Sequence, residues 1–363
     1  MIDWQRMWND DEGVRHLRPT RVILFFLSFF YRLIINLRNW LYDKQIFTSA
    51  SLSCPVISVG NITVGGTGKT PCVIMVTKIL LRHGFKPAVI SRGYGGKKEE
   101  EVNVVSDGSN ILLAAEVAGD EPLMLARALP GVPVITGAKR TDAGGAAVRN
   151  FGANIIICDD AFQHRKIARD IDIVLLDYER PFSNGLLLPA GALREPPKSL
   201  KRADCLIMTR VDEKAVFNKA AHKITESFQR EVFLSRHVVK DVAKGNSSVS
   251  MPLTALRGKK ICAFCGIAQP DSFRKMLVDA RAEIISFDAY PDHYAYHSCD
   301  VEELKDKFIR CHADYLLTTE KDAVRLEKYP GFIKILSILR VEMEIMPSEK
   351  ALENFLLRRV CAV

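Results

Sequence analysis

The segment Gly60–Pro71, with the sequence GNITVGGTGKTP, contains the residue types that bind nucleotide phosphates. It follows the apolar run Pro55–Val59, which predicts a strand that enters a glycine-rich turn. Glycines let backbone N–H groups point at phosphate oxygens, Lys69 can reach the β- and γ-phosphates of ATP, and the Thr70 hydroxyl can bind Mg²⁺. Lys69 is therefore expected to serve both nucleotide binding and catalysis. The predicted nucleotide contacts are Gly65, Gly66, Thr67, Gly68, Lys69 and Thr70.

Two carboxylates, Asp159 and Asp160, end the apolar run that begins at Asn154. An acid at a strand tip beside a phosphate loop binds Mg²⁺ directly or through water. Strands that end in aspartate are common, so this assignment depends on the phosphate loop that precedes it. We expect Asp159, Asp160 and Thr70 to bind the metal, and the sequence does not divide the work between the two aspartates.

The segment Ser91–Gly96 follows another predicted strand and places Arg92 and Tyr94 among glycines. Such a loop suits closure over a phosphorylated or sugar ligand, and a simple surface turn is the alternative. Arg92 and Tyr94, together with Asn61 of the phosphate loop, are the predicted substrate contacts.

The segment Gly191–Pro196 is a loop bounded by glycine and proline that holds a cation next to an acid. Arg194 can stabilise charge on a phosphoryl group during its transfer. Glu195 can join the ligands of Mg²⁺. We therefore expect a catalytic Arg194 and a metal-binding Glu195.

Two candidates for a general base lie far apart in the chain. Asp120, in Gly119–Pro122, stands at a probable helix start, where a carboxylate is stabilised in its charged form. A kinase that phosphorylates a hydroxyl needs a group to accept the proton, although simple helix capping by Asp120 is the alternative. His293, in Pro291–Tyr294, can assist such a base across a cleft, or it can be an ordinary loop residue.

Residues 21–40 predict a helix with a wide apolar face rich in phenylalanine. The longest uncharged run, Val22–Tyr31, is shorter than the ~20 residues of a typical spanning helix. The helix either docks on the protein core or lies on a membrane surface, with Trp40 and the arginines at the headgroups. We favour the membrane surface. At 100° per residue the polar stripe contains Arg21, Ser28, Arg32, Asn36, Asn39 and Asp43.

Short apolar runs alternate with helix-like stretches through the rest of the 363 residues. This pattern predicts an α/β fold: a P-loop NTPase-like, mostly parallel sheet, a second and smaller α/β domain, and an amino-terminal membrane-surface helix. The net charge of +8 suits an anionic partner, and without a dense basic run that includes aromatics we expect no nucleic-acid partner. The expected divisions are an amphipathic helical segment at 1–45, a phosphate-loop domain at 46–239, a linker or connecting strands at 240–258, and a domain at 259–363 that closes the cleft.

The order of these motifs resembles that of the tetraacyldisaccharide 4′-kinases of lipid A biosynthesis, over most of the chain. The phosphate loop is the most specific piece, because Thr63 stands where the general pattern has glycine and the family shares that departure. The matching segments are Gly60–Pro71, Ser91–Gly95, Gly119–Pro122, Asp159–His164, Pro189–Pro196, Pro291–His293 and Thr318–Asp322.

The resemblance implies a P-loop kinase that transfers the γ-phosphate of ATP to the 4′-hydroxyl of a tetraacylated glucosamine disaccharide 1-phosphate, giving lipid IVA. It implies ATP and Mg²⁺ as cofactors, and a site on the cytoplasmic face of the inner membrane of a Gram-negative bacterium. It also implies that Asp120 pairs with His293 as the base. Lys69, Thr70, Asp159, Asp160, Arg194 and Glu195 then occupy the family's nucleotide, metal and phosphoryl-stabilising positions. We expect no obligate protein partner.

Two other functions fit parts of the sequence. The first is a membrane-docked regulatory ATPase or GTPase that acts as a partner-binding switch. Thr209–Asp212 differs from the Asn-Lys-x-Asp loop with which GTPases read guanine, which argues against GTP. The second is a kinase for a soluble small molecule, in which the amino-terminal helix is only structural.

Overall fold

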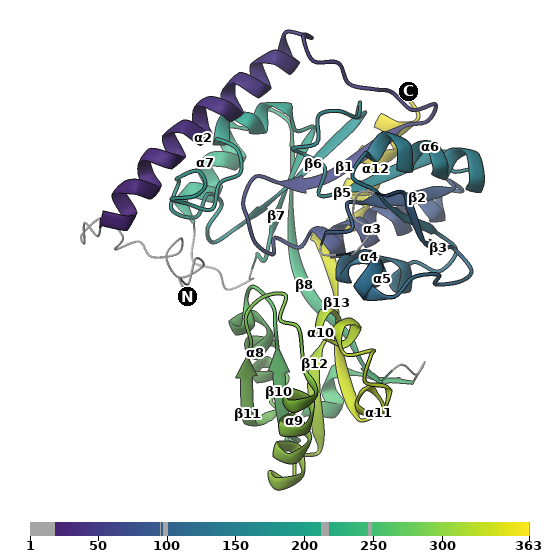
Figure 1. The fold of residues 1–363 in the computed structure, drawn as a ribbon, viewed down its shortest axis with the longest axis vertical. Helices are drawn as coiled ribbons and strands as arrows, with labels where there is room; N and C mark the ends of the chain where they lie inside the picture. The colour runs from purple at the N-terminus through teal and green to yellow at the C-terminus, as the bar shows by residue number, and fades with distance from the viewer. Residues whose placement is uncertain (1–18, 95, 97–100, 212–217, 246–248, 363) are drawn as a thin grey trace.

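One continuous sheet passes through both lobes of the molecule (Figure 1). The computed structural model describes residues 19–94, 96, 101–211, 218–245 and 249–362, and the strands within these ranges number thirteen. Most neighbouring strands are parallel, as the apolar runs predict. The α/β prediction with a mostly parallel sheet is therefore confirmed.

The larger lobe is built around β1 (Val56–Asn61), whose six residues are all buried. Continuous burial of this kind requires helices on both faces of the sheet. The antiparallel edge strand β3 was not predicted from the sequence. In spatial order, β1 lies between the fourth and fifth of these strands: β3 (Asn103–Asp107), β4 (Pro133–Thr136), β2 (Pro87–Ser91), β5 (Ile155–Asp159), β6 (Ile171–Asp177), β7 (Cys205–Thr209) and β8 (Glu231–Lys244).

Alternate residues of these strands pack against helices on opposite faces. Ile57 and Val59 lie in the cluster that contains α3, α5 and α12, whereas Val56 lies in the cluster that contains α6. Ser91 and Asp159 end their strands at the same edge of the sheet, where the cleft described below opens. The helices of this lobe are α3 (Lys69–Arg82), α4 (Ala115–Ala118), α5 (Asp120–Ala128), α6 (Arg140–Phe151), α7 (Lys219–Ser227) and α12 (Glu349–Val360).

The smaller lobe repeats the same plan with shorter elements. Parallel strands β11, β10, β12 and β13 lie side by side, with α8 packed on one face and α9 and α11 on the other. The short strand β9 pairs with β8. The elements are β9 (Ser250–Met251), β10 (Lys260–Cys265), α8 (Pro270–Asp279), β11 (Glu283–Ala289), α9 (Ser298–Arg310), β12 (Tyr315–Thr319), α10 (Glu320–Arg325), α11 (Pro330–Ile333) and β13 (Leu336–Met346).

The two lobes are joined by the antiparallel pair β8 and β13, which runs from one to the other in Figure 1. The expected domain boundary at 239/240 lies inside β8, which pairs with β13 along most of its length. Neither strand reads as an apolar run, because many of their side chains are half-buried and charged residues interrupt them. For residues 240–258 the sequence left a linker or connecting strands open, and the structure has the end of one long strand and β9 there.

Helix α2 (Pro19–Asp43) lies at the outer edge of the larger lobe (Figure 1). Its polar side faces the protein: Ser28 and Asn39 are buried, and the Ser28 hydroxyl donates to Leu187 O at 2.7 Å and accepts from Ala190 N at 2.9 Å. Most of its apolar side chains point away from the protein, although Ile35 is buried. Those that are exposed are Val22, Ile23, Phe25, Phe26, Leu27, Phe29, Phe30, Leu33, Ile34, Leu37 and Trp40.

By length and composition alone, Thr20–Asp43 is apolar enough to cross a membrane, and only 11% of its most apolar 18-residue window is buried. The short uncharged run Val22–Tyr31 therefore does not exclude a spanning helix. The arginines were expected at the headgroups, but Arg38 instead donates to Glu195 in the protein. Trp40 is exposed.

Candidate active site

A cleft of about 1050 Å³ opens where the phosphate loop, the strand tips and the smaller lobe meet. The larger lobe contributes the loop between β1 and α3, and α2 extends the cleft outward with Tyr31 and Ile35. The smaller lobe contributes His293 and Lys321. Most of the predicted site residues line this cleft: Gly65, Gly66, Thr67, Gly68, Lys69, Thr70, Arg92, Tyr94, Asp120, Asp159, Asp160, Arg194 and His293.

Two features hold the phosphate loop in shape. Gly68 has φ of 84°, and a Cβ there would lie 2.8 Å from Nε2 of His237. Asn61 is fully buried, and its Nδ2 donates to Thr67 Oγ1 at 2.8 Å. Asn61 was predicted to contact the substrate, but it does not line the cleft because its side chain is used under the loop. This prediction is wrong, and Asn61 is a support of the phosphate loop.

Asp160 gathers the two cations predicted to act on the transferred phosphoryl group. Arg194 Nη1 donates to both carboxylate oxygens of Asp160, at 3.0 and 2.8 Å, and Lys69 Nζ lies 3.8 Å from Oδ2. Burial alone would raise the pKa of Asp160, but the charges of Lys69 and Arg194 outweigh it and lower the pKa. Asp160 therefore stays ionised and holds both cations at the cleft.

Asp159 has a different environment from its neighbour. It is 1% exposed, and Oδ2 accepts from the Ser91 hydroxyl at 3.2 Å. Its Oδ1 has no hydrogen-bond partner among the described residues. Burial, followed by the charges of Glu121 and Asp160, raises the pKa of Asp159 to about 7. A buried carboxylate oxygen without a partner fits a cation ligand, because a bound cation would supply the missing partner.

Glu195 does not reach this group. Its side chain is fully buried and accepts hydrogen bonds from Arg202 at 3.0 and 3.1 Å and from Asn39 Nδ2 at 2.7 Å, as well as from Arg38. Burial would raise the pKa of Glu195, but the Arg202 charge and these hydrogen bonds lower it. The expected metal-binding role is therefore wrong. Glu195 fastens α2 to the loop that carries Arg194, since Tyr31 on the same helix donates to Arg194 O at 2.9 Å.

Cationic side chains surround the part of the cleft near Arg92 and Tyr94. Arg140 is 3% exposed, and its Nη1 donates to Gly137 O at 3.2 Å. Burial, then the charges of Arg140 and nearby basic residues, lowers the pKa of His164 to about 4, so His164 is neutral at pH 7. This concentration of positive charge favours an anionic ligand.

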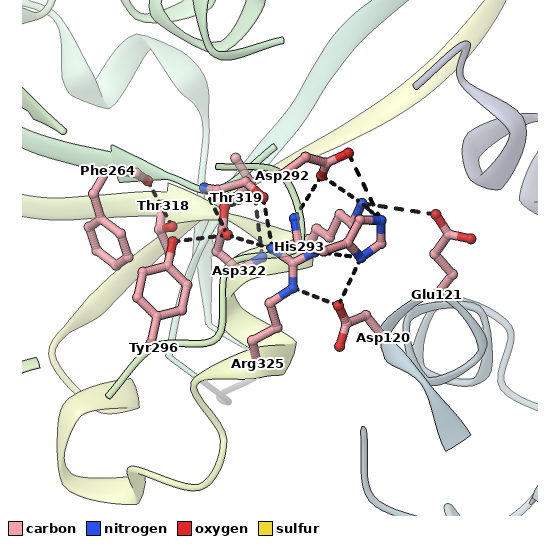
Figure 2. Close-up of polar contacts among 12 residues, drawn as sticks. Asp120, Glu121, Phe264, Asp292, His293, Tyr296, Thr318, Thr319, Asp322 and Arg325 are labelled. Carbon is pink, nitrogen blue, oxygen red and sulfur yellow. Dashed lines mark hydrogen bonds and ion pairs between the residues drawn. The ribbon is translucent and has the colours of Figure 1, made fainter. Parts of the chain in front are cut away.

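On the opposite side of the cleft, the predicted base Asp120 and its predicted support His293 come together with a third residue (Figure 2). His293 Nδ1 lies 3.6 Å from Asp120 Oδ2, although the two residues are far apart in sequence. Arg325 Nε donates to the same Asp120 oxygen at 2.6 Å. Burial alone would raise the pKa of Asp120, but the hydrogen bond with His293 and the charge of Arg325 lower it. Asp120 is therefore a carboxylate at neutral pH.

The other nitrogen of His293 faces a second cation. Lys321 Nζ lies 3.0 Å from His293 Nε2 and 3.1 Å from Asp292 Oδ1. Lys321 also lies 4.0 Å from Glu121 on α5. Residues from both lobes thus form one polar network around the imidazole.

Arg210 and His237 also line the cleft, and the sequence analysis did not identify either as functional. Arg210 pairs with Asp177 and donates to Gly66 O, so it holds the phosphate loop from the end of β7. Its neighbour Asp212, part of the segment compared with guanine-reading loops, lies outside the described residues. Burial lowers the pKa of His237 to about 4 and keeps it neutral under Gly68.

Arg325 is the most important residue that sequence reasoning missed. The segment Thr318–Asp322 was noted, and Arg325 follows one helical turn after Asp322, with which it pairs at 3.2 Å. Residues three apart lie on one face of a helix, so this spacing was the available signal.

Phosphate loops serve many enzymes, but a carboxylate–imidazole pair opposite the loop suits the removal of a proton from an acceptor hydroxyl. The fold and the cleft thus define a P-loop phosphotransferase. The sequence model of one family, described as "Tetraacyldisaccharide-1-P 4'-kinase", matches residues 20–361, and the chain belongs to this family.

Named relatives agree with this assignment. The tetraacyldisaccharide 4′-kinase of Syntrophus aciditrophicus is 42% identical over 362 residues, which cover 97% of this chain and 96% of the relative. The enzyme of the same name from Geobacter metallireducens is 40% identical over 93% of this chain and 99% of its own length. The structure of LpxK from Aquifex aeolicus in complex with ATP matches with a TM-score of 0.76 at 32% identity, covering 94% of this chain and 99% of that one.

Proposed function

We propose that this chain carries out its family's reaction, the transfer of the γ-phosphoryl of ATP to the 4′-hydroxyl of a tetraacylated glucosamine disaccharide 1-phosphate, in the cleft between the lobes. The chain is a lipid kinase of lipid A biosynthesis by family membership. The observation that carries the proposal is that one cleft holds the phosphate loop on one side and the Asp120–His293 pair on the other. The larger lobe supplies the nucleotide site, and the smaller lobe closes the cleft.

In this proposal Asp120 accepts the proton of the acceptor hydroxyl, and His293 supports it. The lowered pKa of Asp120 keeps it in the basic form at neutral pH. Lys69 and Arg194 offset the negative charge that develops on the transferred phosphoryl group, since both already converge on Asp160. Arg92 and Tyr94 contact the substrate.

The Thr70 hydroxyl and the unpaired Oδ1 of Asp159 would hold Mg²⁺, which shields the phosphate charge when it is bound. Asp160 has a different role, because Arg194 already occupies both of its oxygens. Within the described residues no three His, Cys, Asp or Glu side chains form a metal-holding group. One or two carboxylates together with substrate phosphates are the usual ligands of Mg²⁺ in such enzymes.

The amino-terminal helix attaches the enzyme to the cytoplasmic surface of the inner membrane in this proposal. Eleven large apolar side chains of α2 are exposed, while its buried polar residues bind the protein. The contacts between α2 and the larger lobe extend along the helix from Ser28 to Asn39. If α2 crossed the membrane, these contacts would pull the larger lobe into the bilayer. A helix that lies along the surface avoids this cost and gives the cleft access to a lipid substrate through Tyr31 and Ile35.

The experiment that tests the proposal follows ³²P from labelled ATP in detergent micelles that contain Mg²⁺ and the tetraacylated disaccharide 1-phosphate. The expected product is labelled lipid, formed in step with ATP consumption. A regulatory ATPase would instead release labelled free phosphate without labelling the lipid, which would overturn the proposal.

A shortened chain that lacks residues 1–40 separates the lipid kinase from a kinase of soluble molecules. We expect it to lose most transfer to lipid in vesicles, because the enzyme no longer meets its substrate at the surface. Full activity without these residues would contradict the membrane role of α2.

A further inference from the structure

Arg325 connects the candidate base to the framework of the smaller lobe. Its side chain is 6% exposed and donates to three groups. Nε donates to Asp120 Oδ2 at 2.6 Å, while Nη1 donates to Gly266 O at 2.7 Å and to Asp322 Oδ1 at 3.2 Å. Nη2 lies 3.3 Å from Nδ1 of His293. One guanidinium thus touches both members of the proposed Asp120–His293 pair.

The smaller lobe fixes the direction of this guanidinium through Asp322, which is fully buried (Figure 2). Asp322 Oδ1 also accepts from Gly266 N at 2.9 Å and from the Tyr296 hydroxyl at 3.0 Å. Its Oδ2 accepts from the Thr319 hydroxyl at 2.6 Å. Because every one of these partners belongs to the smaller lobe, Arg325 is a rigid extension of that lobe toward α5.

The contacts to Asp120 are arranged on one side of its carboxylate. Arg325 and His293 both approach Oδ2, and none of the described residues forms a hydrogen bond or an ion pair with Oδ1. An Oδ1 that is left open can accept the proton of a bound hydroxyl while Oδ2 is held in place. We propose that Arg325 is a positioning residue for this pair: it clamps Asp120 through Oδ2 and aligns His293 beside it, so that docking of the smaller lobe on α5 completes the base. This inference rests on the proposed role of Asp120 as the base.

Arg325 also contributes to the charge environment of Asp120. The ionisable groups around the pair are Glu121 on α5, Asp292 beside His293, and Lys321, Asp322 and Arg325 on α10. His293 and Arg325 contact Asp120 directly, and both lower its pKa against the effect of burial. Removal of the guanidinium must therefore raise the pH below which Asp120 is protonated and inactive as a base.

The test compares Arg325→Gln and Arg325→Lys with Arg127→Gln in the full chain, using transfer of ³²P to the lipid acceptor across a pH series. Arg127 also joins α5 to the smaller lobe, through Glu327, but it does not line the cleft, so its variant is a matched control. Asp120→Asn and the wild type are measured in parallel.

For Arg325→Gln we expect kcat to fall by roughly 10- to 100-fold, with KM for ATP within about two-fold of wild type, because only the alignment of the base is lost. The acid limb of the pH profile should move up by about one unit. Arg325→Lys keeps the charge but not the forked geometry, so it should restore the acid limb and only part of kcat. Arg127→Gln should resemble the wild type in both measures.

The inference is overturned if Arg325→Gln matches Arg127→Gln in kcat and in the position of the acid limb while Asp120→Asn loses turnover. If Asp120→Asn keeps full turnover, the proposed base itself is wrong, which is a separate failure. Should Arg325→Gln give no cooperative thermal transition, Arg325→Lys decides: a kcat within about two-fold of Arg127→Gln would reject the positioning role.

Discussion

Gly68 shows how one residue sets the shape of the phosphate loop. Its φ of 84° strains any residue with a side chain, and a Cβ would also meet His237. Gly131 has nearly the same φ, 85°, but no atom within 4 Å of a Cβ. We therefore expect Gly68→Ala to lose most ATP affinity, whereas Gly131→Ala should cost only about 1 kcal/mol of stability. Equilibrium nucleotide binding and thermal unfolding of both variants check this, and equal ATP affinities would contradict it.

Glu195 provides a second test at the scale of a residue, because the structure replaces its expected metal-binding role with an anchoring role. Glu195→Gln leaves Arg202 and Arg38 without a charged partner in a buried setting. We expect a loss of about 3 kcal/mol in the free energy of unfolding and an unchanged Mg²⁺ concentration for half-maximal activity. Denaturant unfolding and a Mg²⁺ titration measure the two quantities. A shifted Mg²⁺ requirement with normal stability would restore the metal-binding interpretation.

The residues that could be predicted from sequence share a local signature. Lys69 and Thr70 end a glycine-rich loop, and Asp159 ends an apolar strand, so their neighbours in sequence identify them. Apart from its spacing from Asp322, Arg325 has no such signature, because its partner Asp120 is 205 positions away and only the folded chain brings them together. Glu195 was misassigned for the same reason, since Arg38 and Asn39, which hold it, belong to a distant helix.

At the scale of the element, α2 presents an apolar face that protein contacts do not cover. Phe26→Glu and Phe30→Glu place a charge on that face, at side chains that are 60% and 59% exposed. We expect each to reduce binding to vesicles of anionic phospholipid by roughly ten-fold, because a buried charge in the acyl region is unfavourable. Ile309→Glu on α9, at a side chain that is 67% exposed, is the control. Co-sedimentation with vesicles gives the measurement, and equal losses in all three variants would contradict a specific role of α2.

The junction of α10 and β13 contains a carboxyl group that titrates near neutrality. Burial raises the pKa of Glu320 to about 7, although Val341 N donates to it. A raised carboxyl pKa means that the folded state binds the proton of Glu320 more tightly than the unfolded state does. The stabilisation that this proton gives to the fold is therefore fully present below about pH 4.5 and is lost as pH rises through about 7. Glu320→Gln should therefore lose less thermal stability than the wild type between pH 5 and pH 8. Identical pH dependences of the melting temperature would show that Glu320 does not titrate in this range.

The elements differ in how clearly the sequence predicts them. Strands β1, β5 and β6 are buried on both faces and read as continuous apolar runs. Strands β8 and β13 alternate buried with half-exposed residues and carry charges, so they do not read as apolar runs, and the end of β8 was expected only within a linker or connecting strands. The polar stripe of α2 was visible in sequence, but its orientation toward the protein was not, because that depends on Leu187 and Glu195 far along the chain.

At the scale of the whole molecule, the proposed catalytic group is divided between the lobes. The phosphate loop, Asp160 and Asp120 belong to the larger lobe, whereas His293 and Arg325 belong to the smaller one. Helices α5 and α10 bring the two sets together through ion pairs of Asp120 and Glu121 with Arg325 and Lys321. The lobes must therefore be docked for the base to be complete, and β8 and β13 hold them in one continuous sheet.

The most direct test of this account is the turnover of Asp120→Asn with the lipid acceptor, measured together with its equilibrium affinity for ATP. The amide keeps the size of the side chain and removes only the proton acceptor. The account predicts that kcat falls by roughly 10²–10⁴-fold while ATP affinity stays within about two-fold of wild type. Full turnover in Asp120→Asn would contradict the assignment of the base and, with it, the division of the active site between the two lobes.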